Sequence, residues 1–563
     1  MIKKIGEIAK NSEWLVLVLL TVVFVGLRFS GTGLPLHQDE YKWPSIVNPE
    51  IVSDTEVPHP PLSQFIYRVG GSVVGYNTNF RFIPLFFGTV NLLLLYWLMK
   101  ILYSRREAVI ASVIWIFSYF SVLASLMVDT DGEIMPFFFL LALIGYFKFL
   151  NSDGNKKYWW GALLLVSCVL GFFIKVSFLL AVGAIVADFL WSKKHLLNVG
   201  KLIKYFGGLV LGVFVLGLLL YLAQYIFPFF SLAKALTYWE HFATLERGWF
   251  QTLIQCIKAL LYTSPFLVLV PFLGSKNSFE RIKVFVFFIL FSLVFYVVLF
   301  DFSIGALDRY MQLLVLPLSV ICSVIISKIF QGDDRRFREF FYLGIIVAFV
   351  LILLQSLSHY VPPLHPKSDW VNRALQFKWN FLYPFSGGSG PLGFYVSFLF
   401  MALSWIITFF AILFAKYKPE YKKLVLIFLI PLGFAYNLVF TEEYLVGYWN
   451  GNAPKLLADA VEYIKNNDEI KMVTVYNDNG GNEIQEIGKY RKRLYVDPKF
   501  DLDEKIATLN QYKEHYFVLD VPQIDPTSVY QKYFDSCIPV YKKTDRSMSA
   551  TVYDCRKVPD IKL

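Results

Sequence analysis

Charged residues are scarce in this sequence. Asp, Glu, Lys and Arg make up 17% of its 563 residues, whereas 56% are hydrophobic and 18% are aromatic, and the mean hydropathy is +0.52. These values are typical of a protein that crosses a membrane many times. The net charge of +10 does not predict a nucleic-acid partner, because the basic residues cluster in short loops between apolar segments, where they set membrane topology.

Ionisable residues are nearly absent from the interior of the apolar segments, with Lys258 as the main exception. A pump carries charged or titratable groups along its path through the membrane, so this class of protein is disfavoured. Cysteine is also rare, and three of the five cysteines lie in apolar segments as expected packing residues. Cys537 and Cys555 bracket a predicted hairpin in a polar tail, and they can form a disulfide if that tail is outside the cytoplasm.

Long apolar segments recur along the chain as far as residue 440. No small-residue cleavage site follows the first of them, so we interpret it as a retained helix that begins in the cytoplasm. At roughly 20 residues per crossing, we predict about thirteen transmembrane helices and a mainly α fold, a polytopic helical bundle. The segments are 14–29, 82–102, 108–128, 134–150, 158–174, 176–191, 205–227, 252–273, 284–300, 307–330, 340–360, 392–415 and 424–440.

The basic clusters determine the predicted topology. With the N-terminus inside, the loops after the even-numbered segments are cytoplasmic, and these loops hold clusters such as Arg105-Arg106 and Lys422-Lys423. Residues 158–191 could instead form one long helix, but this would place the later clusters outside, so we reject it. The odd helix count then places the tail outside the cytoplasm, in a multi-pass protein of the plasma or inner membrane.

The change in composition near residue 441 predicts two domains. Residues 1–441 form a transmembrane domain with a long first outer loop at 31–81, and residues 442–563 form an extracytoplasmic α/β domain. In this tail, strand-like and helix-like segments alternate, which predicts a small parallel sheet flanked by helices. The turn at residues 479–482 lacks the Gly-x-Gly-x-x-Gly pattern that cradles a phosphate.

Polar groups concentrate in the loops that are predicted to be outside. Carboxylates can remove a proton from an acceptor hydroxyl, Lys and Arg can neutralise a phosphate leaving group, and apolar grooves between helices can hold a polyprenyl tail. The candidates for the polar roles are Asp39, Glu40 and His59 of the first outer loop, Asp129 and Asp131 of the second, Lys175 at the turn after residue 174, and Arg309 and Tyr310 at the start of the tenth segment.

The order of these motifs resembles that of the GT-C glycosyltransferases. An Asp-Glu pair in a long first outer loop, a following His-Pro-Pro-Leu at 59–62 and an acidic second outer loop are similar to the protein O-mannosyltransferase and aminoarabinose-transferase branch. Residues 171–175 look like the glycine-to-lysine segment of that branch, although Val-Ser follows the lysine here in place of Gly-Pro. Arg309-Tyr310 with Pro317 looks like its Arg-Tyr-x-x-x-Pro segment.

The resemblance implies inverting transfer of a sugar from a polyprenyl-phosphate donor at the outer membrane face. The acceptor is then a protein hydroxyl, a lipid or an envelope glycan. Asp39 corresponds to the catalytic base, with Glu40 beside it, and either Asp129 or Asp131 corresponds to the second-loop carboxylate. No cofactor is expected to be required. The residues expected near the donor phosphate are His59, Lys175, Arg309 and Tyr310.

Each candidate residue also has an alternative explanation. Asp39 and Glu40 could cap an interfacial helix. Asp129 and Asp131 could bind a divalent metal ion, as in oligosaccharyltransferases. The remaining alternatives are a turn cap for His59, snorkelling to the interface for Lys175, and a structural ion pair with Asp301 or Asp308 for Arg309. Alternative functions are a transporter of lipid-linked glycans, a metal-dependent enzyme similar to oligosaccharyltransferases, and a non-catalytic membrane scaffold.

Overall fold

The computed structural model describes most of the chain in two compact units. The described residues are 13–37, 39–48, 59–193, 199–227, 230–243, 248–301, 310–330, 336–361, 368–385, 392–476, 479–494, 517–521 and 534–557. Contacts between residues are dense within each unit, and this defines the two units. The first unit comprises Met1–Thr32, Trp43–Arg338 and Phe409–Leu429, and the second comprises Gly33–Lys42, Glu339–Thr408 and Ile430–Leu563.

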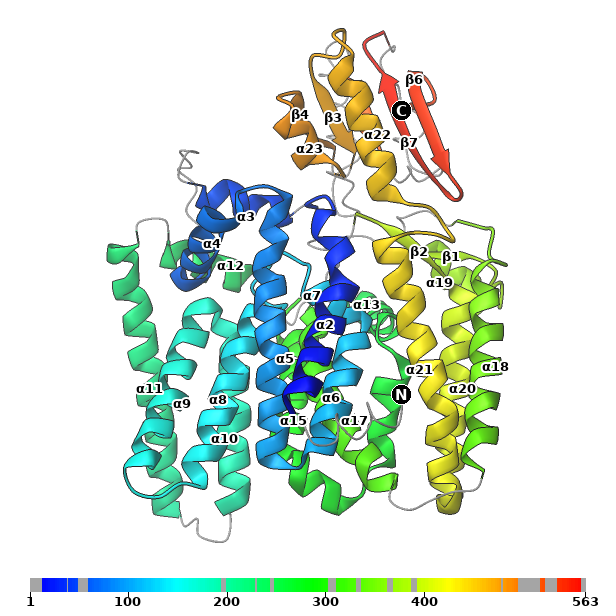
Figure 1. Ribbon diagram of the computed structural model, residues 1–563. Coiled ribbons are helices and arrows are strands. Elements are labelled where there is room, and N and C mark those ends of the chain that lie inside the picture. Colours follow the sequence, from blue (N-terminus) through cyan, green and yellow to red (C-terminus); the bar gives the residue numbers. More distant parts are fainter. Residues whose placement is uncertain are drawn as a thin grey trace. The chain divides into compact units, whose positions relative to one another are not determined.

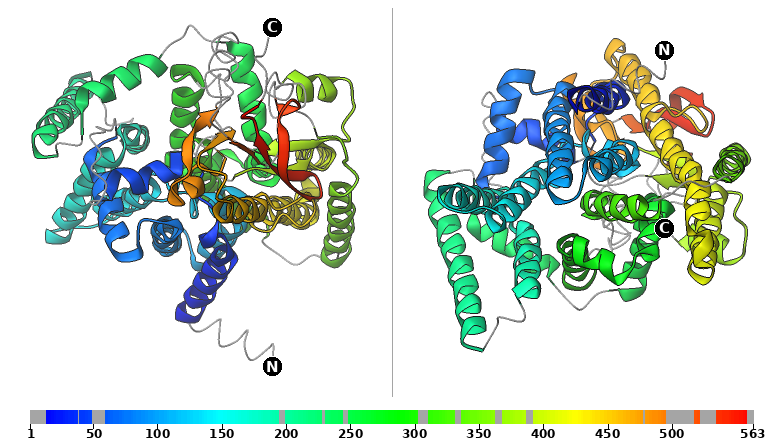
Figure 2. Two further views of the ribbon diagram at one scale, coloured as in Figure 1. Left: turned by 90° about the horizontal axis from the view of Figure 1, so that it is seen from above. Right: turned by 60° about the horizontal axis from the view of Figure 1, so that its bottom comes forward.

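The first unit is built from helices (Figure 1). Helix α5 packs against α2, α6 and α8, and α8 packs against α9; Figure 2 shows α2, in dark blue, beside α5. The helices of this unit are α2 (Glu13–Phe29), α4 (Pro61–Val74), α5 (Phe82–Leu102), α6 (Arg105–Phe117), α7 (Tyr119–Ala124), α8 (Ile134–Leu150), α9 (Asn155–Ile174), α10 (Leu179–Lys193), α11 (Val199–Ile226), α12 (Leu232–Phe242), α13 (Trp249–Tyr262), α14 (Pro265–Leu269), α15 (Lys276–Leu293) and α17 (Val315–Ile329).

Each of the thirteen apolar segments contains helix in the described residues, so the predicted mainly α membrane bundle is confirmed. Nine helices of the described chain are long and apolar enough to cross a membrane, or ten if the bent pair of α13 with α14 and η5 (Val270–Leu273) is one span. The number of full-length spans is lower than the predicted thirteen for a physical reason. Helix α8 and the apolar part of α11 fall below the length of a full crossing, and Ser118 separates α6 from α7.

The predicted break within residues 158–191 lies at Lys175. Helix α9 ends at Ile174, and the backbone of Lys175 is extended, with φ −157° and ψ 135°. A 3-10 turn, η3 (Val176–Phe178), then leads into α10. This segment therefore forms two helices, as the topology prediction requires.

In the second unit, a β-hairpin is tied to two helices by buried polar groups. Strand β1 (Leu382–Phe385) pairs antiparallel with β2 (Phe394–Ser397). The amide of Gln355, in α18 (Phe337–Gln355), accepts a hydrogen bond from the backbone N–H of Ser397 at 2.8 Å and donates one to Glu443 of α21 (Lys422–Leu445) at 3.2 Å. Helices α19 (Ser368–Leu375) and α20 (Phe398–Tyr417) also contribute to this unit, although residues 409–417 of α20 belong to the first unit.

The C-terminal part of the second unit is an α/β fold with a five-stranded sheet of order β4-β3-β5-β7-β6. The predicted parallel pairing holds for β4, β3 and β5, and the predicted hairpin forms β6 and β7, which makes the other half of the sheet antiparallel. The elements are α22 (Ala453–Asn466), β3 (Val473–Tyr476), α23 (Gly481–Glu486), β4 (Tyr490–Leu494), β5 (Phe517–Asp520), β6 (Ile538–Asp545) and β7 (Met548–Asp554).

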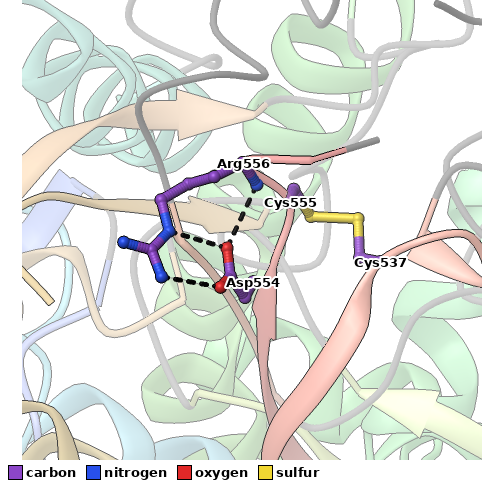
Figure 3. The surroundings of a disulfide bond; sticks show 4 residues. All are labelled: Cys537, Asp554, Cys555 and Arg556. Carbon is purple, nitrogen blue, oxygen red and sulfur yellow. Dashed lines mark hydrogen bonds and ion pairs between the residues drawn. A yellow bond between two sulfur atoms is a disulfide. The ribbon is translucent and has the colours of Figure 1, made fainter. Parts of the chain in front are cut away.

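A disulfide joins Cys537 and Cys555 at the open end of this hairpin (Figure 3). Beside it, the guanidinium of Arg556 donates two hydrogen bonds to the carboxylate of Asp554, at 2.9 and 2.8 Å. These hydrogen bonds lower the pKa of Asp554. The end of β7 is thus held by a covalent bond and an ion pair.

We expect the double variant Cys537→Ser/Cys555→Ser to destabilise the β6–β7 hairpin by about 3 kcal/mol, because the disulfide closes a loop with a sequence separation of 18 residues. Hydrogen exchange of the β6 and β7 amides in the full-length protein would measure this change. Cys168→Ser removes a free thiol of α9 and serves as the control. Equal exchange in all three proteins would contradict the prediction.

Candidate active site

Lys175 and Asp131 form a buried ion pair. The lysine lies at the break after α9, and the aspartate lies in the loop between α7 and α8. The side chain of Asp131 is 0% exposed and that of Lys175 is 15% exposed. Burial lowers the pKa of Lys175, but the nearby carboxylates of Asp131 and Asp129 and the Tyr296 side chain raise it above its ordinary value on balance. The lysine is therefore a charged group in a largely dry place.

Two stacked tyrosines form a wall beside the lysine. The ammonium of Lys175 lies 4.7 Å from the ring centroid of Tyr310, a cation–π distance. The ring of Tyr310 stacks on that of Tyr296, with centroids 5.1 Å apart. Tyr310 was predicted from the sequence, whereas Tyr296 lies among phenylalanines and carries no motif. Aromatic faces attract a nearby cation, so this wall stabilises the ammonium of Lys175.

A small pocket joins these side chains to the first outer loop. It is lined by His59, Lys175, Tyr296 and Tyr310, together with aromatic groups that include Trp239. The structure thus brings together three of the residues predicted near a donor phosphate, from three separate segments. Trp239 was not predicted, because an isolated tryptophan gives no signal of a site.

The first and second outer loops are linked by aromatic stacking. The imidazole of His59 stacks on Trp43 with ring centroids 5.6 Å apart, and Trp43 packs on Tyr67 at 4.8 Å. The hydroxyl of Tyr67, in α4, donates a hydrogen bond to the backbone carbonyl of Asp129 at 2.8 Å. A continuous series of contacts therefore joins the side chain of His59 to the backbone of Asp129.

The two second-loop aspartates have different surroundings. The carboxylate of Asp129 accepts a hydrogen bond from the backbone N–H of Thr130 at 2.6 Å, within its own turn. Asp131 pairs with Lys175. The sequence could not distinguish the two positions, and the structure brings Asp131 to the cationic pocket. Within the described chain, no three His, Cys, Asp or Glu side chains are grouped as metal ligands.

The predicted acidic pair at residues 39 and 40 lies at the start of helix α3 (Asp39–Val47). The side chain of Asp39 lies outside the described residues. Glu40 is fully buried, and its carboxylate accepts a hydrogen bond from the backbone N–H of His37 at 3.0 Å. This is the reach-back contact of a helix cap, and it favours the capping alternative for Glu40. Arg309 also lies outside the described residues.

A large apolar groove is lined in part by residues next in sequence to those of the pocket. It has a volume of about 680 Å³ and is lined by side chains of α13, α15, α17 and the segments beside them, including Leu260, Ile289 and Leu318. Consecutive residues face the two spaces. Tyr296 lines the pocket and Val297 the groove, and Tyr310 lines the pocket and Met311 the groove. The two spaces therefore lie on opposite sides of the same stretches of backbone.

Comparison with known proteins finds one family and several solved structures that are similar to this chain. Residues 58–221 match the family described as dolichyl-phosphate-mannose-protein mannosyltransferase. No curated protein sequence matches the chain. The crystal structure of ArnT from Cupriavidus metallidurans bound to undecaprenyl phosphate is similar, with a TM-score of 0.56 and 13% identity over 96% of this chain and 98% of that one. Its apo state gives a TM-score of 0.53 and 13% identity over 97% and 98%.

The fold is that of a GT-C-type membrane glycosyltransferase, as the motif order predicted. The family match covers residues 58–221, less than half of the chain, and the predicted class of enzyme stays a prediction. The matched segment contains His59, both second-loop aspartates and Lys175. The chain is a multi-pass membrane protein.

We expect Lys175→Met to lower the free energy of unfolding by about 3 kcal/mol, because it leaves the buried carboxylate of Asp131 without its cation. Asp131→Asn should cost less, and the double variant should be more stable than Lys175→Met alone. Unfolding in detergent at several denaturant concentrations measures this cycle. Additive effects of the two substitutions would show that the pair is not coupled.

Proposed function

We propose that this protein transfers a sugar from a polyprenyl-phosphate donor to an acceptor at the outer membrane face, with inversion at the anomeric carbon. The observation that carries the proposal is the Lys175–Asp131 pair beside a pocket whose lining residues are next in sequence to those of an apolar groove. The ammonium suits the donor phosphate, the aromatic wall suits the sugar and the groove suits the polyprenyl chain. The acceptor is a protein hydroxyl, a lipid or an envelope glycan.

The comparisons support the donor class. The ArnT structure that is similar to this chain is described as bound to undecaprenyl phosphate, and the matched family is described by dolichyl-phosphate-mannose. Both names contain a polyprenyl phosphate. The substrate of this chain is proposed by analogy to that shared chemistry, together with the cationic pocket and the apolar groove.

The proposed reaction is a single displacement. The acceptor oxygen attacks the anomeric carbon, the bond from that carbon to the phosphate oxygen breaks, and the electron pair leaves with the phosphate. Asp39 takes the proton from the acceptor hydroxyl as the general base. Lys175 stabilises the phosphate leaving group by its charge, and Asp131 holds the lysine in place. No metal ion takes part in the proposed step.

With a panel of polyprenyl-phosphate monosaccharides, we expect the purified protein in lipid to form a glycosidic product. Asp39→Asn should lower kcat by about 10² to 10⁴-fold, because the acceptor then lacks its base. The matched control is Asp153→Asn, at an exposed position between α8 and α9. Mass spectrometry of the glycosidic product measures the activity of the wild type and of both variants.

Three outcomes would contradict this proposal. Full activity of Asp39→Asn would reject the base. Movement of labelled lipid across the bilayer without any glycosidic product would favour a transporter. Loss of turnover with EDTA, restored by a divalent metal, would favour an oligosaccharyltransferase-like enzyme.

The groove generates a separate prediction about the lipid chain. Leu318→Trp fills part of the groove, so we expect it to raise KM for a donor with a long polyprenyl chain at least about tenfold, which corresponds to about 1.4 kcal/mol of binding. A donor with a short chain should be affected little. Leu211→Trp, on an exposed part of α11, is the control. If Leu318→Trp changes KM equally for both donors, the chain does not occupy this groove.

A further inference from the structure

Arg28 is fully buried near the end of α2, although the helix around it is apolar. Its guanidinium donates hydrogen bonds to the hydroxyls of Ser125 and Ser121, at 2.6 and 3.0 Å, and to the carbonyl of Ile116, at 3.1 Å. It also lies 3.6 Å from the ring centroid of Phe24. The side chain of Arg28 thus links α2 by hydrogen bonds to α6, to α7 and to the first residues after α7, where the second outer loop begins. A charge buried at such a cost in an apolar helix calls for a function.

The far end of the second loop is held by a second set of buried contacts. The side chain of Asn91, in α5, donates to the carboxylate of Glu133 at 2.7 Å and to its backbone carbonyl at 2.8 Å. Glu133 is 0% exposed. Its other carboxylate oxygen is buried and has no hydrogen-bond partner within the described ranges. Burial raises the pKa of Glu133 to about 8, against the opposing effects of Asn91 and the charge of Arg28.

Close packing leaves the loop little freedom between these two ends. A Cβ at Gly132 would lie 2.7 Å from the backbone oxygen of Ala124, and a Cβ at Gly88 would lie 3.0 Å from Ser125 and 3.2 Å from the carboxyl carbon of Glu133. Arg81 adds a contact at the start of the second outer loop, where its guanidinium donates a hydrogen bond to the backbone carbonyl of Leu126 at 2.5 Å. The backbone of the loop is therefore held on both sides of Asp131.

We infer that Arg28 and Glu133 are positioning residues that brace the second loop, so that Asp131 stays paired with Lys175 in the pocket. Neither side chain lines the pocket itself; each acts through the loop, Arg28 at the entry and Glu133 at the exit. This inference rests on the proposed function for its effect on catalysis. Its structural part, the fixed position of the loop, can be tested without any activity.

The structural test is hydrogen–deuterium exchange of residues 126–135 in the full-length protein in lipid nanodiscs. Arg28→Met and Glu133→Ala should each speed exchange of these amides about tenfold, because local opening then becomes easier. The control is Tyr146→Phe, which removes a buried hydrogen bond to Asp188 farther along α8. It should leave the loop unchanged. Unaltered exchange in both brace variants would overturn the inference.

A milder variant covers the case in which Arg28→Met does not fold. Ser125→Ala removes one hydrogen bond of the guanidinium and leaves the others in place. Exchange of residues 126–135 should then be about threefold faster than in the wild type. No increase for Ser125→Ala, in a protein that is otherwise intact, would also overturn the inference.

The kinetic test separates positioning from binding. Arg28→Met and Glu133→Ala should lower kcat about 10²-fold, because a small displacement of reacting groups has an effect of this size, while KM for the donor changes less than about threefold. Arg28→Lys and Glu133→Gln should recover part of kcat, and Tyr146→Phe should keep all of it. Unchanged kcat in both brace variants, or a change in KM alone, would reject the catalytic role. If the wild type shows no turnover with any donor, the proposed function fails, and the exchange result still decides whether the brace exists.

Discussion

The ion pair between Lys175 and Asp131 is the interaction on which the arrangement of the first unit depends. Both groups have lost most of their contact with water, and either one alone would be strongly destabilising in this place. The turn after α9 and the second outer loop must therefore meet. The break between α9 and α10 makes this possible, because it releases the lysine from a helix at the level of the loop. The stacked rings of Tyr296 and Tyr310 complete the surroundings of the cation. A bundle made almost entirely of apolar side chains can thus contain this small polar pocket.

The features that could be predicted from the sequence depend on patterns that are local or ordered along the chain. Apolar segment length located the helices, and the basic clusters required the break at Lys175, because a single long helix would have inverted the later loops. The order of the outer-loop motifs indicated the GT-C class. It also identified His59, Lys175 and Tyr310 as partners, and the structure places all three around one pocket. Alternation of strand-like and helix-like segments predicted the parallel half of the C-terminal sheet.

The features that could not be predicted depend on three-dimensional contacts that leave no local pattern. Asp129 and Asp131 are equivalent in sequence, and in the structure Asp131 pairs with Lys175, whereas the carboxylate of Asp129 accepts a hydrogen bond within its own turn. Tyr296 lies among phenylalanines, where a pattern of aromatic residues indicates lipid contact or packing. Arg28 interrupts an apolar segment in the sequence, but its serine partners lie about a hundred residues farther on. Glu40 appears beside the proposed base in sequence, and in the structure its carboxylate accepts a hydrogen bond from the backbone of His37.

The π-helix η6 (Val294–Leu299) contributes neighbouring residues to the pocket and to the groove. A π-turn widens the helix, and Tyr296 and Val297 within it face different cavities. The same division occurs at Tyr310 and Met311, so the two spaces share walls made from single stretches of backbone. A displacement of either stretch of backbone would therefore change the shape of both spaces at once. Filling one space can thus alter the other without any contact between the two occupants.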